Sequence, residues 1–370
     1  MHLCAFIGTG SNGTCTLSFF PIDNTLSRDD PVMKSVMTAI ASSINNAEFT
    51  HQLVPLSWMK TLDEIINLKK SSISIEEYSA IASSCNVSSL DELNLLRYFH
   101  EMGYLMWHDQ PVLRDVIILD PIDFFVKPAT LIICKHIEDG NDPTLHFLPV
   151  HIKCEEMHRQ KFNDLTTKGI LHSSLLSILW EGFAEHSAIL LHLMCLYGLL
   201  VPLLYNTTDE SSDVITSPVS EKYLVPSLLL SSSSSQYKEK WLDDRAYQTC
   251  YIVFSSSKDM ETKSNIQLSD LRSDCFLPNG LFERLVGTVV GWCQLTSKVV
   301  QIDTNLLFKD LAILRYGRQR FRLSLQQDLS LICLDVEGMV RLSFFLLYKT
   351  IISTDIIHSC VIIAESFGGP

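Results

Sequence analysis

Side chains that are able to bind a metal ion lie close together in the middle of this 370-residue chain. His151, Cys154 and His158 form a His-x2-Cys-x3-His pattern, and imidazole nitrogens and thiolate sulfurs are common zinc ligands. A zinc site also needs a fourth ligand and outer residues that orient the first four. Because histidine and cysteine are also ordinary core residues, we expect no metal site. A metal-dependent enzyme of unknown class, using residues 146–160, is the alternative.

Carboxylates near this cluster could supply acid and base chemistry. Asp120, Asp123, Glu155 and Glu156 are the candidates, but no pattern places two of them across a cleft. The chain also lacks the Gly-x-Ser-x-Gly motif that holds a nucleophilic serine. The sequence therefore predicts a non-catalytic protein without catalytic, cofactor-binding or metal-ligating residues.

A glycine-rich segment near the N-terminus matches a nucleotide-binding pattern. Gly8, Gly10 and Gly13 fit Gly-x-Gly-x-x-Gly, which binds a pyrophosphate when a helix follows it. Here a β-prone run, residues 14–20, follows instead, and the chain has no Gly-Lys-Ser/Thr sequence. We expect a loop at this position and no bound nucleotide.

The composition excludes several classes of protein. With 29 Lys and Arg against 42 Asp and Glu, the formal net charge is −13 and repels nucleic-acid phosphates. Eleven cysteines without a Cys-x-x-Cys pair argue against a disulfide framework or a zinc ribbon. The first residues show no secretory signal. These features favour a cytoplasmic protein with reduced thiols.

The elements that would position these residues begin with a strand, followed by four helices. Apolar spacing predicts a strand at 17–22, a helix from Pro31, and another from Pro55 that carries Leu62 and Ile65. Capping boxes at Ser74 and Ser89 predict two further helices, the second ending at Gly103. Extended segments at 104–107 and 116–119 then suggest a hairpin. Helices followed by a hairpin are the order of a winged helix.

The same order recurs about one hundred residues later. Leu190, Met194 and Gly198 occupy the positions of Leu95, Phe99 and Gly103, each shifted by 95. The uncharged segment 188–205 is about long enough to span a membrane. Its match to an amphipathic segment instead predicts a buried helix that continues into a strand.

DNA binding is an alternative use of a winged helix, in which the third helix enters the major groove. The predicted exposed face of 90–102 carries mainly Asp91, Glu92 and Glu101, with Arg97 as a cation, and 188–205 has no Lys or Arg. Such helices cannot neutralise phosphates, so we expect a protein-contact module and no nucleic acid.

A serine-rich segment, 231–235, separates this helical part from a more strand-rich part. The second part has a predicted strand at 251–254 and a helix near Pro278 that carries Leu281 and Phe282. An antiparallel meander follows between 311 and 336, with a last helix at about 339–349. The predicted fold class is α+β, with a tandem winged-helix-like part followed by a mixed sheet-and-helix part.

The ordered motifs of the chain resemble those of the COR domain, which follows the Ras-like Roc GTPase domain in Roco proteins. The matching segments cover about residues 50–345 and are Leu53–Trp58, Ser74–Tyr78, Leu96–Gly103, Leu113–Pro121, Gly169–His172, Leu224–Leu229 and Phe276–Leu285. Residues 17–47 are similar to the last strand and helix of a Roc domain, but the motifs that bind GTP in Roc are absent from the chain.

The resemblance implies a domain layout and a function. It implies a Roc remnant at 1–47, a winged-helix-like COR-A part at 48–230, a linker at 231–250 and a COR-B part at 251–370. It further implies a scaffold that binds a Roc GTPase domain in cis or in trans, forms a homodimer and couples the nucleotide state of Roc to downstream signalling. No cofactor and no membrane span are expected.

Overall fold

The computed structural model describes the chain in segments. These are residues 2–9, 15–22, 29–46, 53–135, 148–203, 220–232, 247–254, 277, 280–296, 302–316, 319–326, 331–337 and 360–365. Its contacts divide it into two units, residues 1–69 with 76–96, and residues 70–75 with 97–370. Each unit is described by itself.

The N-terminal segment is a strand pair with one helix. Strands β1 (His2–Thr9) and β2 (Cys15–Ile22) pair antiparallel, and α1 (Pro31–Asn45) contacts β2. The Asp30 side chain caps α1 by accepting the Val32 N–H at 2.9 Å. Strand β2 and helix α1 confirm the predicted elements, whereas the sequence analysis did not predict β1.

Three helices follow: α2 (Leu56–Asn67), α3 (Ile75–Ser84) and α4 (Glu92–Glu101). Helix α2 buries Leu62 and Ile65 as predicted, but Ile66 is 57% exposed. The predicted start of α4 at Ser89 is wrong by about two residues. The Ser88 hydroxyl accepts the Leu90 N–H at 3.3 Å, so a turn precedes the helix.

The first small sheet differs from the predicted hairpin. Strand β4 (Val116–Ile118) pairs antiparallel with β3 (Ser72–Ser74), and only Met106 of the predicted strand 104–107 forms a bridge, to Ile118. The two backbone bonds of that bridge measure 2.8 and 2.9 Å. The strand that precedes α3 therefore takes the place next to β4.

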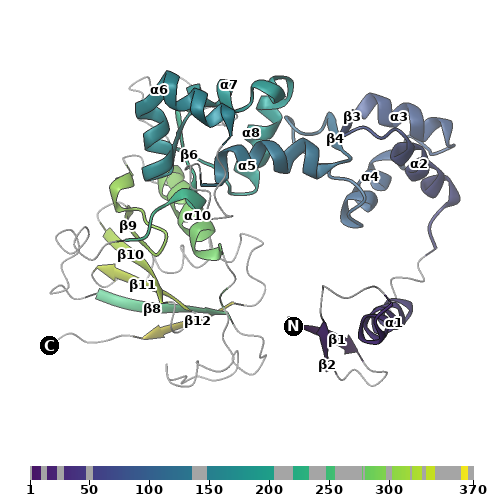
Figure 1. Ribbon diagram of the computed structural model, residues 1–370, viewed down its shortest axis with the longest axis horizontal. Helices are drawn as coiled ribbons and strands as arrows, with labels where there is room; N and C mark the ends of the chain where they lie inside the picture. Colours follow the sequence, from purple (N-terminus) through teal and green to yellow (C-terminus); the bar gives the residue numbers. More distant parts are fainter. Residues whose placement is uncertain are drawn as a thin grey trace. The chain divides into compact units, whose positions relative to one another are not determined.

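The predicted repeat is confirmed. The first copy comprises α2, β3, α3, α4 and β4, and a second copy of this arrangement follows it in the chain. The second copy comprises α6 (Pro149–Lys168), β5 (Ile170–His172), α7 (Ser173–Leu179), α8 (Ser187–Leu196), β6 (Val201–Leu203) and β7 (Lys222–Leu224) (Figure 1). The strand order is β5-β7-β6, so the strand before the helices again pairs with the last one. Residues 170–172 form β5 because they pair with 222–224, and helix α7 consequently begins at Ser173.

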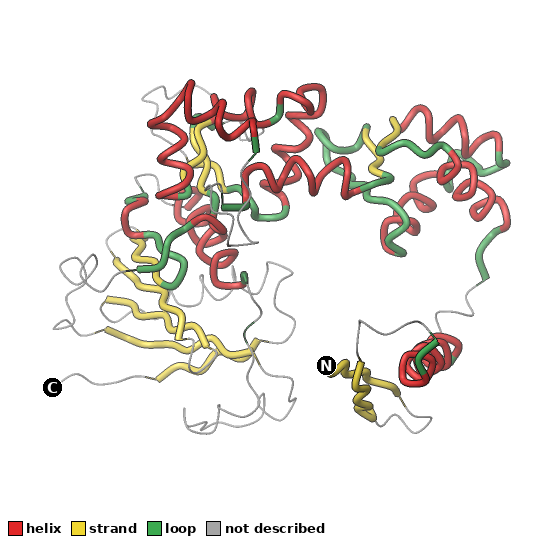
Figure 2. The backbone as a smooth tube through the Cα atoms, in the orientation of Figure 1, coloured by secondary structure: helices red, strands yellow, loops and turns green. Residues whose placement is uncertain are grey.

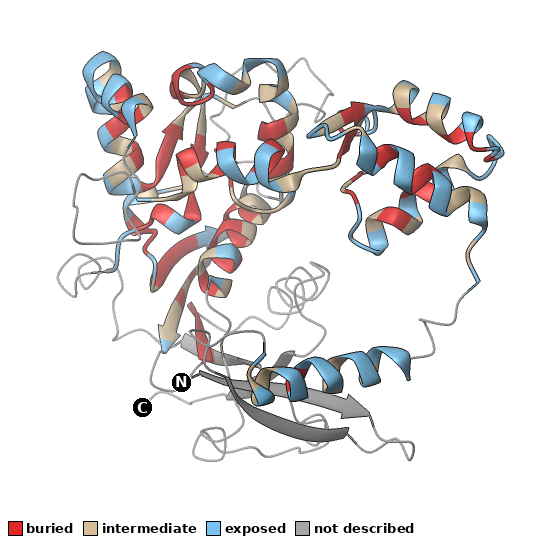
Figure 3. Cartoon of the chain, turned by 45° about the vertical axis from the view of Figure 1, so that its right-hand side comes forward, coloured by how far each residue is buried: buried red, intermediate tan, exposed pale blue. Residues whose placement is uncertain are grey.

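One core joins the two copies within the second unit. Between them lie the π-helix η2 (Ile122–Val126) and α5 (Lys127–Ile133), with the 3-10 helix η3 (Glu181–His186) before α8. The buried side chains of this core include Ile118, Phe124, Ile132, Leu165, Leu175, Trp180, Leu190 and Met194. Figure 3 draws buried residues in red. The indole N–H of Trp180 donates to the Pro128 carbonyl at 2.9 Å.

The C-terminal part is a five-stranded antiparallel sheet with one long helix (Figure 2). The sheet order is β12 (Cys360–Glu365), β8 (Tyr247–Phe254), β11 (Leu331–Glu337), β10 (Gln319–Gln326) and β9 (Leu311–Tyr316). Strands β9, β10 and β11 confirm the predicted meander, and α10 (Leu281–Thr296) confirms the predicted helix. The predicted last helix, 339–349, lies outside the described residues.

Candidate functional site

His151 is a structural core residue in the described chain. Its side chain is fully buried at the start of α6. Its Nδ1 accepts the backbone N–H of Leu148 at 2.9 Å, which leaves the hydrogen on Nε2 to donate to the Leu131 carbonyl at 2.9 Å. Both ring nitrogens are occupied by backbone partners, so neither lone pair is available to a metal ion.

The other two members of the His-x2-Cys-x3-His pattern do not complete a ligand set. Cys154 is fully buried, and this burial raises the pKa of its thiol to about 11, which opposes the thiolate form that zinc requires. His158 lies at a kink of α6, with φ −141° and ψ 50°. No group of three or more His, Cys, Asp or Glu side chains with metal-binding geometry occurs in the described residues.

The four candidate carboxylates are not paired across a cleft. Asp120 caps the helix that follows it by accepting the N–H of Ile122 at 2.9 Å. Asp123 of η2 forms an ion pair with Lys127, the first residue of α5, and this hydrogen-bonded pairing raises the pKa of Lys127. Glu155 and Glu156 are exposed on α6. These roles are typical of helix capping and solvated surface.

The glycine-rich pattern at Gly8 connects two antiparallel strands. Gly8 and Thr9 end β1 and Cys15 begins β2, with Thr9 opposite Cys15 in the register. Gly10 and Gly13 lie outside the described residues. Since a strand follows the pattern instead of a helix, the helix N-terminus that binds a pyrophosphate is missing here.

The arginine of helix α4, Arg97, forms an ion pair within the protein. Arg97 pairs with Asp109 at 3.2 Å, and Arg114 pairs with the same carboxylate at 2.6 Å. Hydrogen bonding to Arg114, with further contributions from Arg97, lowers the pKa of Asp109. Arg97, the arginine of α4, is thus paired with a carboxylate of the same chain.

Within the described residues 188–203, the apolar segment 188–205 forms a buried helix followed by a strand, as predicted. Leu190, Leu193 and Met194 of α8 are at most 1% exposed, and β6 begins at Val201. Among the described helices, none combines the length and the apolar character that crossing a bilayer requires.

The most extensive functional candidate is the contact between the second copy and α10. Gly287 lets α10 lie close to Pro226 of the second copy, because a Cβ at Gly287 would lie 3.0 Å from Cγ of Pro226. The Gln294 amide donates to the Pro202 carbonyl at 3.0 Å. One buried core extends from this contact into the sheet and includes Val201, Leu203, Leu224, Phe282, Val286, Val289, Val290, Ala312, Leu323, Ile332 and Leu334. The second copy, α10 and the sheet therefore share one packed core.

Two further contacts fix this junction. Ser232 N and Oγ donate to the two carboxylate oxygens of Asp310 at 2.6 and 2.8 Å, and Lys309 N donates to the Leu230 carbonyl at 2.9 Å. The first residues of the serine-rich segment are thus hydrogen-bonded to the turn before β9. The rest of that segment, from 233, lies outside the described residues.

A polar network crosses three strands of the sheet. Asp335 on β11 lies opposite Arg322 on β10 and Thr249 on β8. Arg322 donates to it at 2.9 and 2.7 Å, and the Thr249 hydroxyl donates at 2.8 Å. Asp335 is only 2% exposed, so the network holds a buried charge in place.

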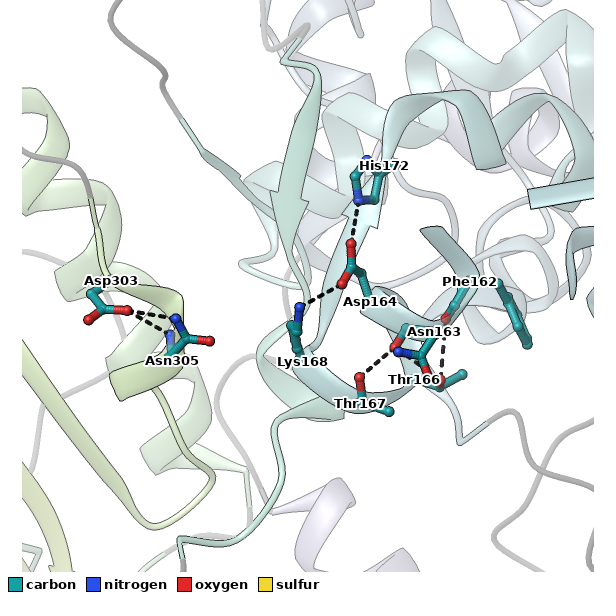
Figure 4. Close-up of polar contacts among 9 residues, drawn as sticks. All are labelled: Phe162, Asn163, Asp164, Thr166, Thr167, Lys168, His172, Asp303 and Asn305. Carbon is teal, nitrogen blue, oxygen red and sulfur yellow. Dashed lines mark hydrogen bonds and ion pairs between the residues drawn. The ribbon is translucent and has the colours of Figure 1, made fainter. Parts of the chain in front are cut away.

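A second ion-pair cluster closes α6 onto β5 (Figure 4). Asp164 accepts hydrogen bonds from Lys168 at 2.8 Å and from His172 Nε2 at 3.0 Å. Burial on its own would raise the pKa of Asp164, but these two donors outweigh it and lower the pKa. Figure 4 also shows Asp303 capping η7 (Thr304–Leu306) through Asn305.

The two copies differ at the end of their third helix. Met102 and Tyr104, which flank Gly103, are 50% and 48% exposed. Their counterparts 95 residues later, Tyr197 and Leu199, pack against the core of the second unit. The first copy therefore presents half-exposed apolar side chains at positions where those of the second copy are partly buried.

The sequence analysis missed the residues that form the junction and the polar network. Gln294 and Asp310 carried no recognised motif. Asp335 stands in a run of apolar residues, Leu331 to Val336, and an isolated charge in a buried strand is a signal for a cross-strand partner. Arg322, in the neighbouring strand, is that partner.

Comparisons with known proteins give one family match. The model for C-terminal of Roc, COR-A domain, matches residues 55–123. Among solved structures, the chain is similar to Roco2 RocCORdC of Methanosarcina barkeri bound to GDP, with 18% identity and a TM-score of 0.37. That similarity covers 55% of this chain and 52% of the other, so the chain spans about half of that protein. No curated protein matches the chain.

Proposed function

Because residues 55–123 match the model of the COR-A domain, as the sequence resemblance predicted, we propose that the chain is a non-catalytic scaffold of a Roco-type protein. It couples a Roc GTPase domain, supplied in cis or in trans, to dimerisation and downstream signalling in the cytoplasm. The family match over 55–123 is the observation that carries this proposal.

The proposed layout keeps the predicted boundaries. Residues 1–47 are a remnant of the Roc domain, 48–230 are COR-A, 231–250 are the linker and 251–370 are COR-B. Two strand-helix-helix-strand copies with the same strand order support a tandem winged-helix-like COR-A part. The second copy lacks a cationic recognition helix, which supports protein contact as the use of this fold.

The first copy supplies the proposed contact for Roc. Met102 and Tyr104 are about half exposed, although their counterparts in the second copy are packed. Exposed apolar side chains of this kind favour a protein partner. The acidic net charge of −13 further disfavours nucleic acid as the partner.

The proposed relay runs from COR-A to COR-B through α10. The contacts of Gly287 and Gln294 and the shared core join the second copy to the sheet. A relay requires contacts whose free energy differs between the GTP and GDP states of Roc. We propose that the homodimer forms through COR-B, as the family resemblance implies.

Two measurements on the purified chain test the scaffold. Multi-angle light scattering should give twice the mass of 41.9 kDa, and calorimetric titration with a Roc-type GTPase domain from the same organism should give saturable binding. Met102→Glu should weaken this binding at least about tenfold, because it places a charge in a desolvated contact. Met157→Glu is the matched control, since Met157 is 58% exposed on α6.

The possible results test the scaffold function and the location of the Roc contact separately. Tight Roc binding that Met102→Glu weakens and Met157→Glu leaves unchanged supports the proposed contact. A monomer that binds no Roc domain contradicts the scaffold function. Equal effects of the two substitutions contradict the location of the contact.

A further inference from the structure

Two arginines lie directly opposite each other near the end of the β9–β10 hairpin. Arg315 on β9 is exposed and pairs in register with Arg320 on β10, which is partly buried. Like charges in directly opposite positions repel each other and weaken a strand pair. Arg315 forms no ion pair with the residues that the structure describes. The hairpin thus carries an exposed positive charge on a chain whose net charge is −13.

The hydrogen bonds of β9 show which way Arg315 directs its backbone N–H and C=O groups. The N–H of Leu325 on β10 donates to the Asp310 carbonyl at 2.8 Å, so the carbonyl of Asp310 faces β10. The N–H of Phe308 donates to the Leu311 carbonyl at 2.7 Å, so the carbonyl of Leu311 faces the other side. Because successive strand residues alternate between the two sides, the backbone groups of Arg315 also face away from β10.

The side of β9 that faces away from β10 is an edge of the sheet, since β9 is an end strand (Figure 1). The bridge between Leu307 and Ala312 occupies the beginning of this edge, and no described segment pairs with it at Arg315. An open edge is a template for a further strand. The same alternation makes Arg315 and Arg320 a non-hydrogen-bonded pair, in which the side chains lie closer together than in a hydrogen-bonded pair.

The buried carboxylate of this face of the sheet is already engaged. Asp335 lies on the same face as Arg320, because it is opposite Arg322, two residues further along β10. Arg322 and Thr249 donate to both of its oxygens. A carboxylate for Arg315 must therefore come from outside this network.

We propose that the edge of β9 at Arg315 binds an extended, acidic peptide segment of a partner protein. The segment adds a strand to the sheet, with its backbone bonded to the N–H and C=O of Arg315. A Glu or Asp side chain next to Arg315 accepts two parallel hydrogen bonds from the guanidinium, a geometry that favours arginine over lysine. This surface is formed by other elements than the Roc contact proposed at Met102.

A strand-forming peptide fits this edge better than a nucleic acid or an anionic membrane surface. Phosphate groups would use the charge of Arg315 but not its backbone N–H and C=O groups. An added strand uses both, because main-chain hydrogen bonds provide affinity and the side chains of the added strand provide specificity.

Fluorescence anisotropy of the full chain with a labelled peptide that alternates glutamate and valine tests the proposal. We expect saturable binding at neutral pH that weakens with added salt. Arg315→Glu should weaken this binding at least about tenfold, because it places like charges side by side. Arg159→Glu is the matched control, since Arg159 is exposed on α6 and the change in net charge is the same. The control should bind as the unmodified chain does.

A second peptide, which alternates glutamate and proline, distinguishes strand addition from attraction between charges alone. It has the same charge but lacks half of the N–H groups that a strand needs, so it should bind at least about tenfold more weakly. Arg315→Glu should fold, because its carboxylate lies opposite Arg320. If it does not fold, Arg315→Gln replaces it and should weaken binding at least about threefold.

Three results would overturn the proposal. The first is no binding of the glutamate–valine peptide to the unmodified chain. The second is equal binding of the two acidic peptides, which would show that charge alone attracts them. The third is an equal effect of Arg315→Glu and Arg159→Glu, which would show that the peptide does not bind at β9.

Discussion

Gly103 and Gly198 lie 95 residues apart and end their helices in the same way. Both have a positive φ, 75° and 68°. The N–H of Tyr104 donates to the Phe99 carbonyl at 3.0 Å, and that of Leu199 donates to the Met194 carbonyl at 2.8 Å. This identity of backbone bonds supports an internal duplication, with one copy inside the matched COR-A segment and the other after it.

Gly169→Ala should destabilise the chain more than Gly103→Ala. Both positions have a positive φ, which costs an L-residue about 1 kcal/mol. At Gly169 a Cβ would also lie 2.9 Å from the Val225 carbonyl oxygen, whereas nothing lies within 4 Å at Gly103. Urea unfolding should show a further loss of about 1–3 kcal/mol for Gly169→Ala. Equal losses would contradict the close approach of β7 to this turn.

Asp335→Ala should cost about 3–5 kcal/mol of unfolding free energy, because it leaves Arg322 without its buried counter-charge. Arg322→Met alone should be similarly costly. The double variant Arg322→Met with Asp335→Leu should be more stable than either single variant, since no unpaired charge remains. A double-mutant cycle from urea unfolding measures this, and strictly additive losses would show that the two side chains do not interact.

His151→Ala should lower the unfolding free energy by roughly 2–4 kcal/mol, because it leaves a cavity and two unsatisfied backbone groups, at Leu148 and Leu131. The half-exposed His158 serves as the control, and His158→Ala should cost less than about 1 kcal/mol. Zinc and a chelator should leave the melting temperature of the unmodified chain unchanged. Stabilisation by stoichiometric zinc would instead support the metal-dependent alternative.

Phe282→Ala should cost about 3–5 kcal/mol, because Phe282 is 2% exposed in the core between α10 and the sheet. Leu281 is partly buried at the edge of the same core, so Leu281→Ala should cost less than half as much. Thermal or urea unfolding of the two single variants distinguishes them. A larger loss for Leu281→Ala would mean that α10 is rotated about its axis.

The elements that the sequence predicted share strong local signals. Helix α1 has an aspartate cap and a proline at its first position, and α8 was placed by its repeat relationship despite its uniform apolar character. Strands β3 and β5 have three residues each, too few for an alternating pattern, and they depend on partners about 40–50 residues away in the chain. Local spacing cannot predict such pairing.

For the candidate metal site, too, the sequence showed the local pattern but not the tertiary contacts that decide its role. The spacing of His151, Cys154 and His158 fits a ligand set and a core helix equally well, and only the contacts of His151 with Leu148 and Leu131 decide between them. The junction of α10 with the second copy depends on the tertiary approach at Gly287. Sequence periodicity identified the helix but could not identify its partner.

The central claim is that the chain responds to the nucleotide state of a Roc domain. The most direct measurement is the Kd of the purified chain for a Roc-type GTPase domain from the same organism, loaded with GDP or with a non-hydrolysable GTP analogue. We expect binding whose Kd differs at least about fivefold between the two states, which is the lower end of typical allosteric coupling. Equal Kd values in the two states, or no binding in either, would contradict it.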